Sequence, residues 1–329
     1  PLMATLRTWR TDPVAETPER ITVGDIPALN AVFSDAFSER YRKDGLVGVR
    51  VPHLNPLIWR YAIEGAQVGA MLWRTERGAI AAFNIAHRSG SEGWMGPLAV
   101  LPELQARGLG RTIVQAGVDH LRGEGCVTIG LETMPRTMDN IGFYSRQGFL
   151  PGPLTVTLTY EAVAAAVEPP LVLLGRLAPG RRDDVIAECA ALLATLRPGW
   201  DWRRELALTD ALALGDTVLL FRGTTLAAFA LCHAAPLVEG RAREELRVLK
   251  LAARSDADAE ALLGHVGEYA RSAGTRRVAV RVQGDAARLY AALVARGARV
   301  RWTDLRMALG THPEPAQPAD GVLLSNWEI

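Results

Sequence analysis

A glycine-containing turn is the clearest chemical signal in this sequence. It runs Gln105-Ala106-Arg107-Gly108-Leu109-Gly110-Arg111 and joins an apolar strand, Leu98-Ala99-Val100, to a helical pattern. Backbone N–H groups converge on an anion at such a turn, and the dipole of the following helix favours negative charge by about 0.3–1 kcal/mol. A Cβ at Gly108 or Gly110 would block the approach of phosphate oxygens. The turn therefore predicts a pyrophosphate cradle.

The same turn argues against two common nucleotide sites. No Gly-Lys-Ser/Thr follows it, so it is not a Walker A loop, and Gly108-Leu109-Gly110 lacks the third glycine of the dinucleotide fingerprint. A nucleoside triphosphate or NAD is therefore disfavoured.

The motif Gln105-x-x-Gly108-x-Gly110 resembles the acetyl-CoA signature of the GNAT superfamily of N-acetyltransferases. A second stretch, Phe143-Tyr144-Ser145-Arg146-Gln147-Gly148-Phe149, resembles another element of that family and follows at the expected distance. The resemblance implies acetyl-CoA as co-substrate and transfer of its acetyl group to a primary amine, by direct attack in a ternary complex. The acceptor would be an amine-bearing small molecule or a peptide N-terminus.

The resemblance also implies which residues bind the co-substrate. Leu98 to Val100 would bind the pantetheine arm, with the Val100 amide facing the thioester carbonyl, and the amides of Ala106 to Arg111 would hold the pyrophosphate. The family commonly has Asn seven residues before the tyrosine, where this chain has Thr137, and the nearby Asn is Asn140. The predicted cofactor-binding residues are Leu98, Ala99, Val100, Gln105, Ala106, Arg107, Gly108, Leu109, Gly110, Arg111 and Asn140.

Acetyl transfer needs a proton donor for the leaving thiolate and a proton acceptor for the amine. Tyr144 is the predicted general acid, as the resemblance implies, and the alternative is a tyrosine that only packs in the core. Glu132, twelve residues earlier, is the predicted base because its spacing resembles that of related N-terminal acetyltransferases; the alternative is a solvated carboxylate at a strand end. Glu92, His87 and a water chain are reserve candidates for the base.

The elements that position these residues alternate between strands and helices. Strands are predicted at 21–23, twice between 65 and 86, and at 98–101, 127–131 and 154–158; helices are predicted at about 28–37, 108–123 and 140–146. This pattern and the resemblance predict an α/β (α+β) class with two tandem GNAT folds, each a mixed, mostly antiparallel twisted sheet flanked by helices. The expected organisation is an N-terminal arm (1–20), a catalytic domain (21–160), a linker (161–170) and a degenerate GNAT-like domain (171–329).

The second half repeats the first under a shift of 149 residues. The shift places Gly274 on Gly125, Gly297 on Gly148, and Arg247-Val248-Leu249 on Leu98-Ala99-Val100. The residues that carry chemistry are lost: Ala257 and Ala259 replace the two glycines, Leu293 replaces Tyr144 and Arg281 replaces Glu132. We therefore expect no CoA site in the second half, which instead packs against the first, shapes the acceptor cleft or forms a homodimer.

Composition narrows the other possibilities. Lys+Arg of 37 against Asp+Glu of 36 argues against a nucleic-acid or membrane partner. Three widely spaced cysteines and the absence of a signal-peptide pattern or a long apolar run favour a cytoplasmic protein, and the preference for Arg and Ala favours a bacterial one. The scattered histidines predict no metal site.

Two other readings stay open from the sequence. The chain could be a non-catalytic acyl-CoA-binding sensor or scaffold, or a purely structural tandem protein. The acceptor amine is open as well, because residues 33–60 and the second half, where its specificity is expected to lie, contain no chemical motif.

Overall fold

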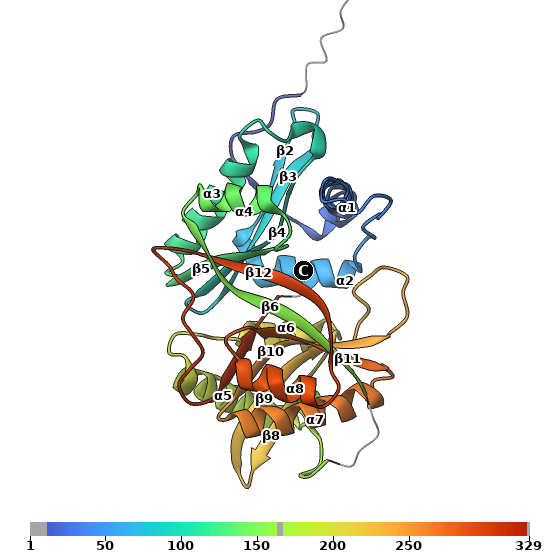
Figure 1. Ribbon diagram of the computed structural model, residues 1–329, viewed down its shortest axis with the longest axis vertical. Coiled ribbons are helices and arrows are strands. Elements are labelled where there is room, and N and C mark those ends of the chain that lie inside the picture. The colour runs from blue at the N-terminus through green and yellow to red at the C-terminus, as the bar shows by residue number, and fades with distance from the viewer. Residues whose placement is uncertain (1–11, 163–166, 328–329) are drawn as a thin grey trace, which may run out of the picture.

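The computed structural model describes residues 12–162 and 167–327, and its two halves are stacked along the long axis of the molecule (Figure 1). The strands of the first half are β1 (Glu19–Arg20), β2 (Ala70–Arg74), β3 (Ile80–Ser89), β4 (Glu92–Val100), β5 (Thr128–Thr133) and β6 (Phe149–Glu161). Its helices are α1 (Ile26–Lys43), α2 (Pro56–Ala66), α3 (Leu109–Gly123) and α4 (Met138–Ser145).

The second half continues the same alternation of strands and helices. Its strands are β7 (Val172–Leu173), β8 (Gly215–Arg222), β9 (Thr225–His233), β10 (Glu245–Ala253), β11 (Arg277–Gln283), β12 (Arg299–Leu309) and β13 (Val322–Ser325). Its helices are α5 (Pro179–Leu196), α6 (Arg203–Ala211), α7 (Asp256–Ser272) and α8 (Ala287–Ala295). Helices flank a mixed sheet in both halves, which confirms the predicted fold class.

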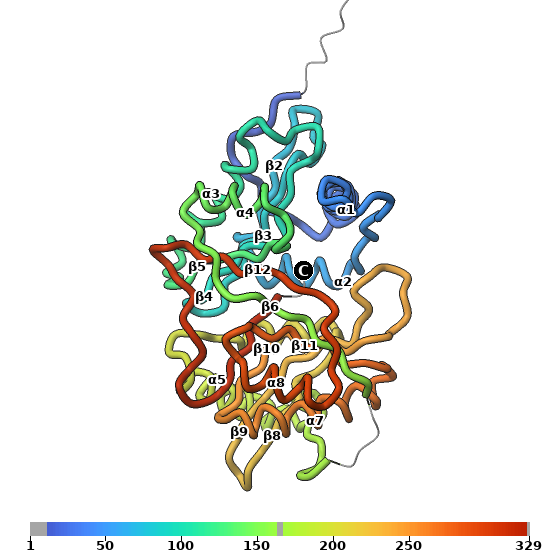
Figure 2. The backbone as a smooth tube through the Cα atoms, in the orientation of Figure 1, coloured from blue at the N-terminus to red at the C-terminus, as the bar shows by residue number. Residues whose placement is uncertain are grey.

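One sheet of 13 strands runs through both halves within the described residues. Its order is β1-β2-β3-β4-β5-β12-β6-β11-β10-β9-β8-β7, with β13 paired to β10. The late strand β12 therefore lies between two strands of the first half, with Met307 opposite Leu131 on one side and Thr303 opposite Val156 on the other. Figure 2 shows this red segment crossing beside the green β6 at the junction of the halves. The halves thus exchange strands as well as pack together.

Each half has two cores because side chains alternate between the faces of a strand. In the first half, Leu72 and Phe83 pack with α1 and α2, whereas Met71 and Trp73 pack with α3 on the opposite face. In the second half, one core lies under α7 and α8 and the other under α5 and α6.

The predicted repeat is present in the structure. A shift of 149 residues carries β5 onto 277–282, where β11 lies, and α4 onto 287–294, where α8 lies. Asp304 of β12 is the counterpart of Thr155 of β6 under this shift, and the two residues pair directly as antiparallel neighbours. The two copies therefore face each other about an approximate twofold axis at this pair.

The shift fails for one strand that the sequence comparison included. Parallel pairing aligns Glu92 with Thr128 in the first half and Glu245 with Arg277 in the second. Thr128 and Arg277 are related by the shift of 149 residues, whereas Glu92 and Glu245 are related by a shift that is four residues longer. Leu98-Ala99-Val100 therefore corresponds to Leu251-Ala252-Ala253, and not to Arg247-Val248-Leu249 as the ungapped shift predicts. The connection after the strand differs in length, which an ungapped comparison cannot detect.

The N-terminal segment also differs from the prediction. Residues 1–11 and 163–166, which belong to the predicted arm and linker, lie outside the described residues. Glu19–Arg20 pairs with β2, and a short 3-10 turn occupies Val23–Asp25 where a strand was expected. The Asp25 carboxylate causes this turn, because it accepts hydrogen bonds from the backbone N and the Oγ of Thr22, both at 2.8 Å.

Candidate active site

Two cavities meet beside Leu98 of β4 and Tyr144 of α4. One, of about 330 Å³, lies between α1, β4, α3 and α4, and the other, of about 510 Å³, lies between the first and second halves. Leu98, Asn140 and Tyr144 line both. A group bound in one cavity can therefore reach a group bound in the other at this point.

The edge of β4 is open beside the first cavity. β4 pairs in parallel with β5 only from Glu92 to Met95, whereas its pairing with β3 continues to Val100 after a bulge at Gly96 and Pro97. Among the described residues, no strand pairs with the outer edge of residues 98–100. An extended ligand with amide groups can therefore bind along this edge by backbone hydrogen bonds.

The glycine-containing turn leads directly into the start of α3. Gly108 is the N-cap, its φ of +88° lies in the left-handed region, and no side chain caps the helix there. A Cβ at Gly108 would meet no protein atom within 4 Å, so the backbone angle, rather than crowding within the protein, requires glycine. The amides of Leu109 and Gly110 at the start of α3 are thus available to an anion, whereas those of Arg111 and Thr112 donate to the carbonyl of Gly108 at 3.0 and 3.2 Å.

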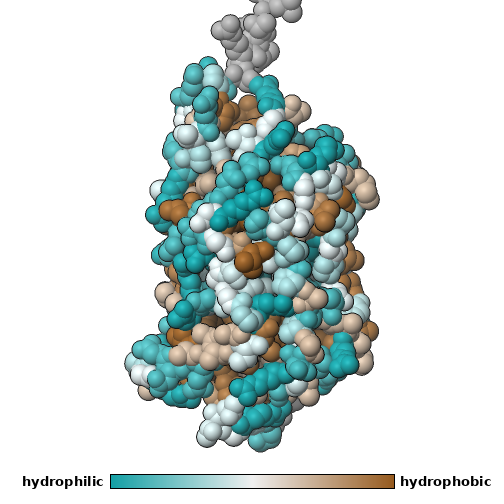
Figure 3. Space-filling model, turned by 90° about the vertical axis from the view of Figure 1, so that its left-hand side faces the viewer, coloured by the Kyte–Doolittle hydropathy of each residue, from teal (hydrophilic) through white to brown (hydrophobic). Residues whose placement is uncertain are grey.

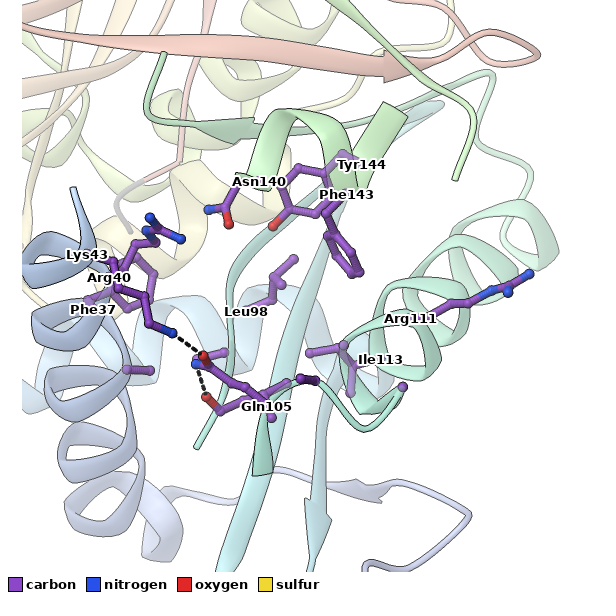
Figure 4. Close-up of a pocket in the computed structure, with 16 residues that line it drawn as sticks. Phe37, Arg40, Lys43, Leu98, Gln105, Arg111, Ile113, Asn140, Phe143 and Tyr144 are labelled. Carbon is purple, nitrogen blue, oxygen red and sulfur yellow. Dashed lines mark hydrogen bonds between the residues drawn. The ribbon is translucent and has the colours of Figure 1, made fainter. Parts of the chain in front are cut away.

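Gln105 fixes the turn to its surroundings, as the dashed lines of Figure 4 show. Its Nε2 donates to the carbonyl of Val100 at 3.1 Å, and its Oε1 accepts from Nζ of Lys43 at 3.1 Å. Lys43 comes from the last turn of α1, so it brings a cation to the same end of the cavity as the turn.

Most of the predicted cofactor-binding residues line the first cavity. Nine of the eleven do so: Leu98, Ala99, Val100, Gln105, Ala106, Gly108, Gly110, Arg111 and Asn140. The side chains of Arg107 and Leu109 instead line a separate hollow beside residues 12–16. The contacts predicted for those two residues are through their backbone amides.

The contribution of α1 to the first cavity was not predicted from the sequence. Phe37, Arg40 and Lys43 line the first cavity from this helix, and Ile113 and Phe143 line it from α3 and α4. The helical pattern at 28–37 was detectable, but the face of the helix that meets the turn depends on tertiary packing.

Tyr144 is buried at the junction of the two cavities. Its ring packs edge-on against Phe143 and Phe149, with centroids 5.2 and 6.1 Å away. Burial raises the pKa of the phenol to about 12, so the hydroxyl stays protonated at neutral pH. Figure 4 shows the ring projecting from α4 toward Leu98. The group can therefore act as a hydrogen-bond donor in the cavity.

Glu132 lines the second cavity but is held by two cations. Arg281 Nη2 donates to Oε2, Arg306 Nη1 donates to Oε1 at 2.8 Å, and Thr155 Oγ1 donates to Oε1 at 2.6 Å. Although burial opposes the charged form, the two guanidinium groups lower the pKa of the carboxyl to about 2. Its role as the base stays a prediction, and this environment makes it a weak proton acceptor.

The reserve candidates for the base lie in different places. Glu92 is fully buried and accepts hydrogen bonds from Trp94 Nε1 and Ser325 Oγ, both at 2.9 Å, outside either cavity. His87 lines the second cavity. Thr137, at the position of the family Asn, is buried and donates to Asp44 Oδ2 at 2.7 Å, whereas Asn140 lines both cavities.

The second cavity takes its walls from both halves. Phe33 and Tyr41 of α1 lie on one side, and Ala279, Arg281 and Trp302 of the second half lie on the other. The sequence predicts acceptor recognition in residues 33–60 and the second half, and the lining of this cavity comes from both regions. The strand exchange that joins these two parts has no local sequence signal.

The equivalent region of the second half is closed. β13 pairs with β10 from Lys250 to Ala253, along the edge that corresponds to the open edge of β4. The connection between strand and helix shrinks from eight residues (101–108) to two, Arg254 and Ser255. Ser255 caps α7 by accepting from the backbone N of Asp258 at 3.1 Å. The strand edge and the helix start that are open in the first half are therefore both occupied here.

The described part of the chain contains neither a metal-ligating cluster nor a membrane-spanning helix. Over residues 12–162 and 167–327, no group of three or more His, Cys, Asp or Glu side chains is placed to hold a metal ion. None of the helices in that part of the chain has the length and apolar character needed to cross a membrane.

Comparison with known proteins gives matches in sequence and in structure. Residues 30–149 match the model of the Acetyltransferase (GNAT) family. A stretch of 57 residues is 37% identical to YjhQ, an uncharacterized N-acetyltransferase of Escherichia coli (strain K12). That stretch is 17% of this chain and 28% of the relative, so the match spans less than a third of the relative's length.

Two solved structures share the fold over nearly the whole chain. A putative acetyltransferase from Pyrococcus horikoshii has a TM-score of 0.66 at 16% identity and covers 94% of this chain and 93% of its own. A tandem GNAT protein from the clavulanic acid biosynthesis pathway has a TM-score of 0.59 at 12% identity. The match covers 92% of this chain and 100% of that protein. Residues 30–149 of this chain are therefore a GNAT-family acetyltransferase domain, within a chain that has the fold of a tandem GNAT protein.

Proposed function

We propose that this protein transfers the acetyl group of acetyl-CoA to a primary amine at the junction of the two cavities. The observation that carries the proposal is the meeting of a cavity beside an anion-binding turn with a second cavity at Leu98 and Tyr144. Acetyl-CoA would occupy the first and the amine the second, so that both substrates bind before the reaction, as a ternary complex requires.

The first cavity suits a CoA thioester in three ways. The open edge of β4 offers backbone groups to the amides of the pantetheine arm. The uncapped start of α3 and the left-handed Gly108 offer amides to the pyrophosphate. Lys43 adds a cation at the same end. The amides of residues 106–110 and the side chains of Lys43 and Asn140 are the groups that we propose hold it.

The chain supplies two groups for the chemistry. In our proposal the amide of Val100 donates to the thioester oxygen as negative charge develops there. Tyr144 donates its proton to the departing sulfur, a role for which the raised pKa keeps it protonated. Glu132 is better suited to neutralise the positive charge of its two arginine partners beside the acceptor cavity than to take up a proton.

The acceptor cavity favours an amine with an apolar or aromatic body. Besides Tyr144, its aromatic lining consists of Phe33, Phe37, Tyr41, Trp94, Trp302 and Trp327. Its charged groups are largely paired within the protein: Arg281 binds both Glu132 and Asp304, and Arg40 binds Asp44. A small molecule or a peptide N-terminus with apolar neighbours would fit this lining.

A thiol-release assay with acetyl-CoA and a panel of primary amines tests the proposal. We expect turnover with at least one amine and a fall of about 10²-fold in kcat for Tyr144→Phe. Tyr290→Phe on α8, which lines neither cavity, is the matched control and should leave kcat unchanged. Binding of acetyl-CoA without turnover on any amine would favour the alternative function, an acyl-CoA-binding sensor or scaffold.

A further inference from the structure

His87 is a second ionisable side chain at the reaction site, and it comes from β3. It pairs across the sheet with Trp94, immediately before the bulge of β4 at Gly96 and Pro97. His87, Gly96 and Leu98 all line the second cavity together with Tyr144. The ring therefore borders the acceptor cavity beside the part of β4 where the thioester is proposed to bind.

A hydrogen bond fixes the tautomer of this histidine. Its Nε2 lies 2.8 Å from the carbonyl oxygen of Gly96, which can only accept, so Nε2 carries the proton and Nδ1 has the lone pair. None of the described residues hydrogen-bonds to Nδ1. Fully buried side-chain polar atoms without a hydrogen-bond partner do occur in this protein, but Nδ1 of His87 is not one of them, so it is at least partly accessible. Nδ1 is thus an acceptor atom that a molecule in the cavity can reach.

The surroundings keep the ring neutral. Burial, with a smaller contribution from the cation of Lys250, lowers the pKa of His87 to about 4. Trp327 stacks on the ring at 6.2 Å between centroids and adds no charge. At neutral pH the imidazole is therefore unprotonated, and because the lowered pKa makes it a weaker base than a free histidine, its proposed contribution depends on its position beside the amine.

The neighbouring carboxylates are less suited to this role. Glu132 is held by Arg281 and Arg306, and Glu92 is sealed in a buried cluster with Trp94 and Ser325. His87 is thus an acceptor group that combines a place in the cavity beside Gly96 and Leu98 with an atom left open to a ligand.

We propose that His87 takes the proton from the attacking amine in the acetyl transfer proposed above, on which this inference rests. The bond between the amine nitrogen and the acetyl carbon forms, and the bond between that carbon and sulfur breaks. The proton of the nitrogen, which becomes acidic as its bond to carbon forms, passes to Nδ1 of His87. The sulfur takes the proton of Tyr144 Oη, and both side chains return to their starting states by exchange with solvent.

Single-turnover measurements on matched variants test this role. His87→Gln keeps a donor for the Gly96 carbonyl but cannot accept a proton, and His87→Ala leaves space for added imidazole. The acceptor probe is the most active of tryptamine, spermidine, kanamycin and a peptide with a free N-terminal alanine. His312→Gln, at a histidine that lines neither cavity, and Glu132→Gln are the controls.

We expect His87→Gln to lower the single-turnover rate constant by about 10²-fold or more while the Kd for acetyl-CoA changes by less than about twofold. Imidazole should raise the rate of His87→Ala and not that of Glu132→Gln, and His312→Gln should match the wild type. Wild-type transfer with His87→Gln equally fast would overturn the role of His87 and leave the proposed function standing. An absence of transfer by the wild type with every amine, despite acetyl-CoA binding, would overturn both.

Discussion

Tyr144 and Glu132 line the same cavity, and their surroundings change their acidity in opposite directions. Burial alone acts on the phenol and raises its pKa to about 12. Two guanidinium groups act on the carboxyl and lower its pKa to about 2. One group is therefore kept protonated and the other ionised over the whole physiological range.

The pH dependence of acetyl transfer should reflect the phenol. Because Tyr144 acts in its protonated form and its pKa is raised, we expect no loss of kcat from its ionisation below about pH 11. The measurement is kcat for the best amine between pH 7 and 10.5 in the wild type. A basic limb near pH 9 that disappears in Tyr144→Phe would contradict this expectation.

Glu132 should make stability depend on pH in acid. Its pKa in the folded chain is lowered from 4.5 to about 2, so its contribution is present above pH 4.5 and is lost as pH falls toward 2. The full contribution is on the order of 3 kcal/mol. We expect urea unfolding to show a steeper loss of stability from pH 5 to 3 in the wild type than in Glu132→Gln. Parallel curves would show that the carboxyl is not held by its arginines.

At this scale the sequence predicted where the candidate groups lie better than it predicted their surroundings. Tyr144 and the glycines lie in a local motif, so they could be found and placed. The partners of Glu132, Arg281 and Arg306, lie 149 and 174 residues away on strands of the second half. No local sequence pattern indicates ion pairs over such distances along the chain, although Arg281 occupies the position equivalent to Glu132 in the repeat.

The element on which the proposed acetyl-CoA site depends most is the connection of β4, the turn and α3. Its strand, turn and helix were predictable because each has a distinct pattern: apolar residues, glycines, then apolar residues at helical spacing. The reason for Gly108 was only partly predictable. The structure adds that its backbone is left-handed, with a φ of +88°.

This backbone requirement predicts a specific stability change. Gly108→Ala should lower the free energy of unfolding by about 1–2 kcal/mol because alanine is strained in the left-handed region. Gly123→Ala at the end of α3 should be neutral or stabilising by up to about 1 kcal/mol, because its added Cβ meets no atom within 4 Å and its φ is not left-handed. Urea unfolding of both variants measures the difference, and changes of the same sign would contradict the argument.

At the scale of the whole molecule, the strand exchange makes the halves interdependent. β6 belongs to the first half in sequence, yet its two neighbours in the sheet, β11 and β12, both come from the second. The repeat was predictable from the sequence because its glycines and strands align. The strand exchange was not predictable, because the sequence pattern would be the same if each half had kept its own last strand. The homodimer stays a prediction. On the face of the molecule that Figure 3 shows, hydrophobic residues are scattered among hydrophilic ones.

Separated halves should therefore fail to fold alone. Residues 1–162 would leave both edges of β6 without their partners, so we expect this fragment to be insoluble or unfolded by itself. Co-expression with residues 163–329 should give a soluble complex. Circular dichroism and gel filtration of the separate and co-expressed fragments make the comparison, and cooperative unfolding of residues 1–162 alone would contradict the account.

The most direct test of the central claim is isothermal titration of acetyl-CoA into the wild type and two matched variants. Gly108→Asp places a carboxylate at the predicted cradle, and Ala257→Asp places one at the equivalent position of the second half, where Ala257 is exposed at the start of α7. We predict one site per chain, a loss of affinity of 10²-fold or more in Gly108→Asp (about 3 kcal/mol), and unchanged binding in Ala257→Asp. Two sites per chain, no binding by the wild type, or a loss in Ala257→Asp would contradict the assignment of the acetyl-CoA site to the first half.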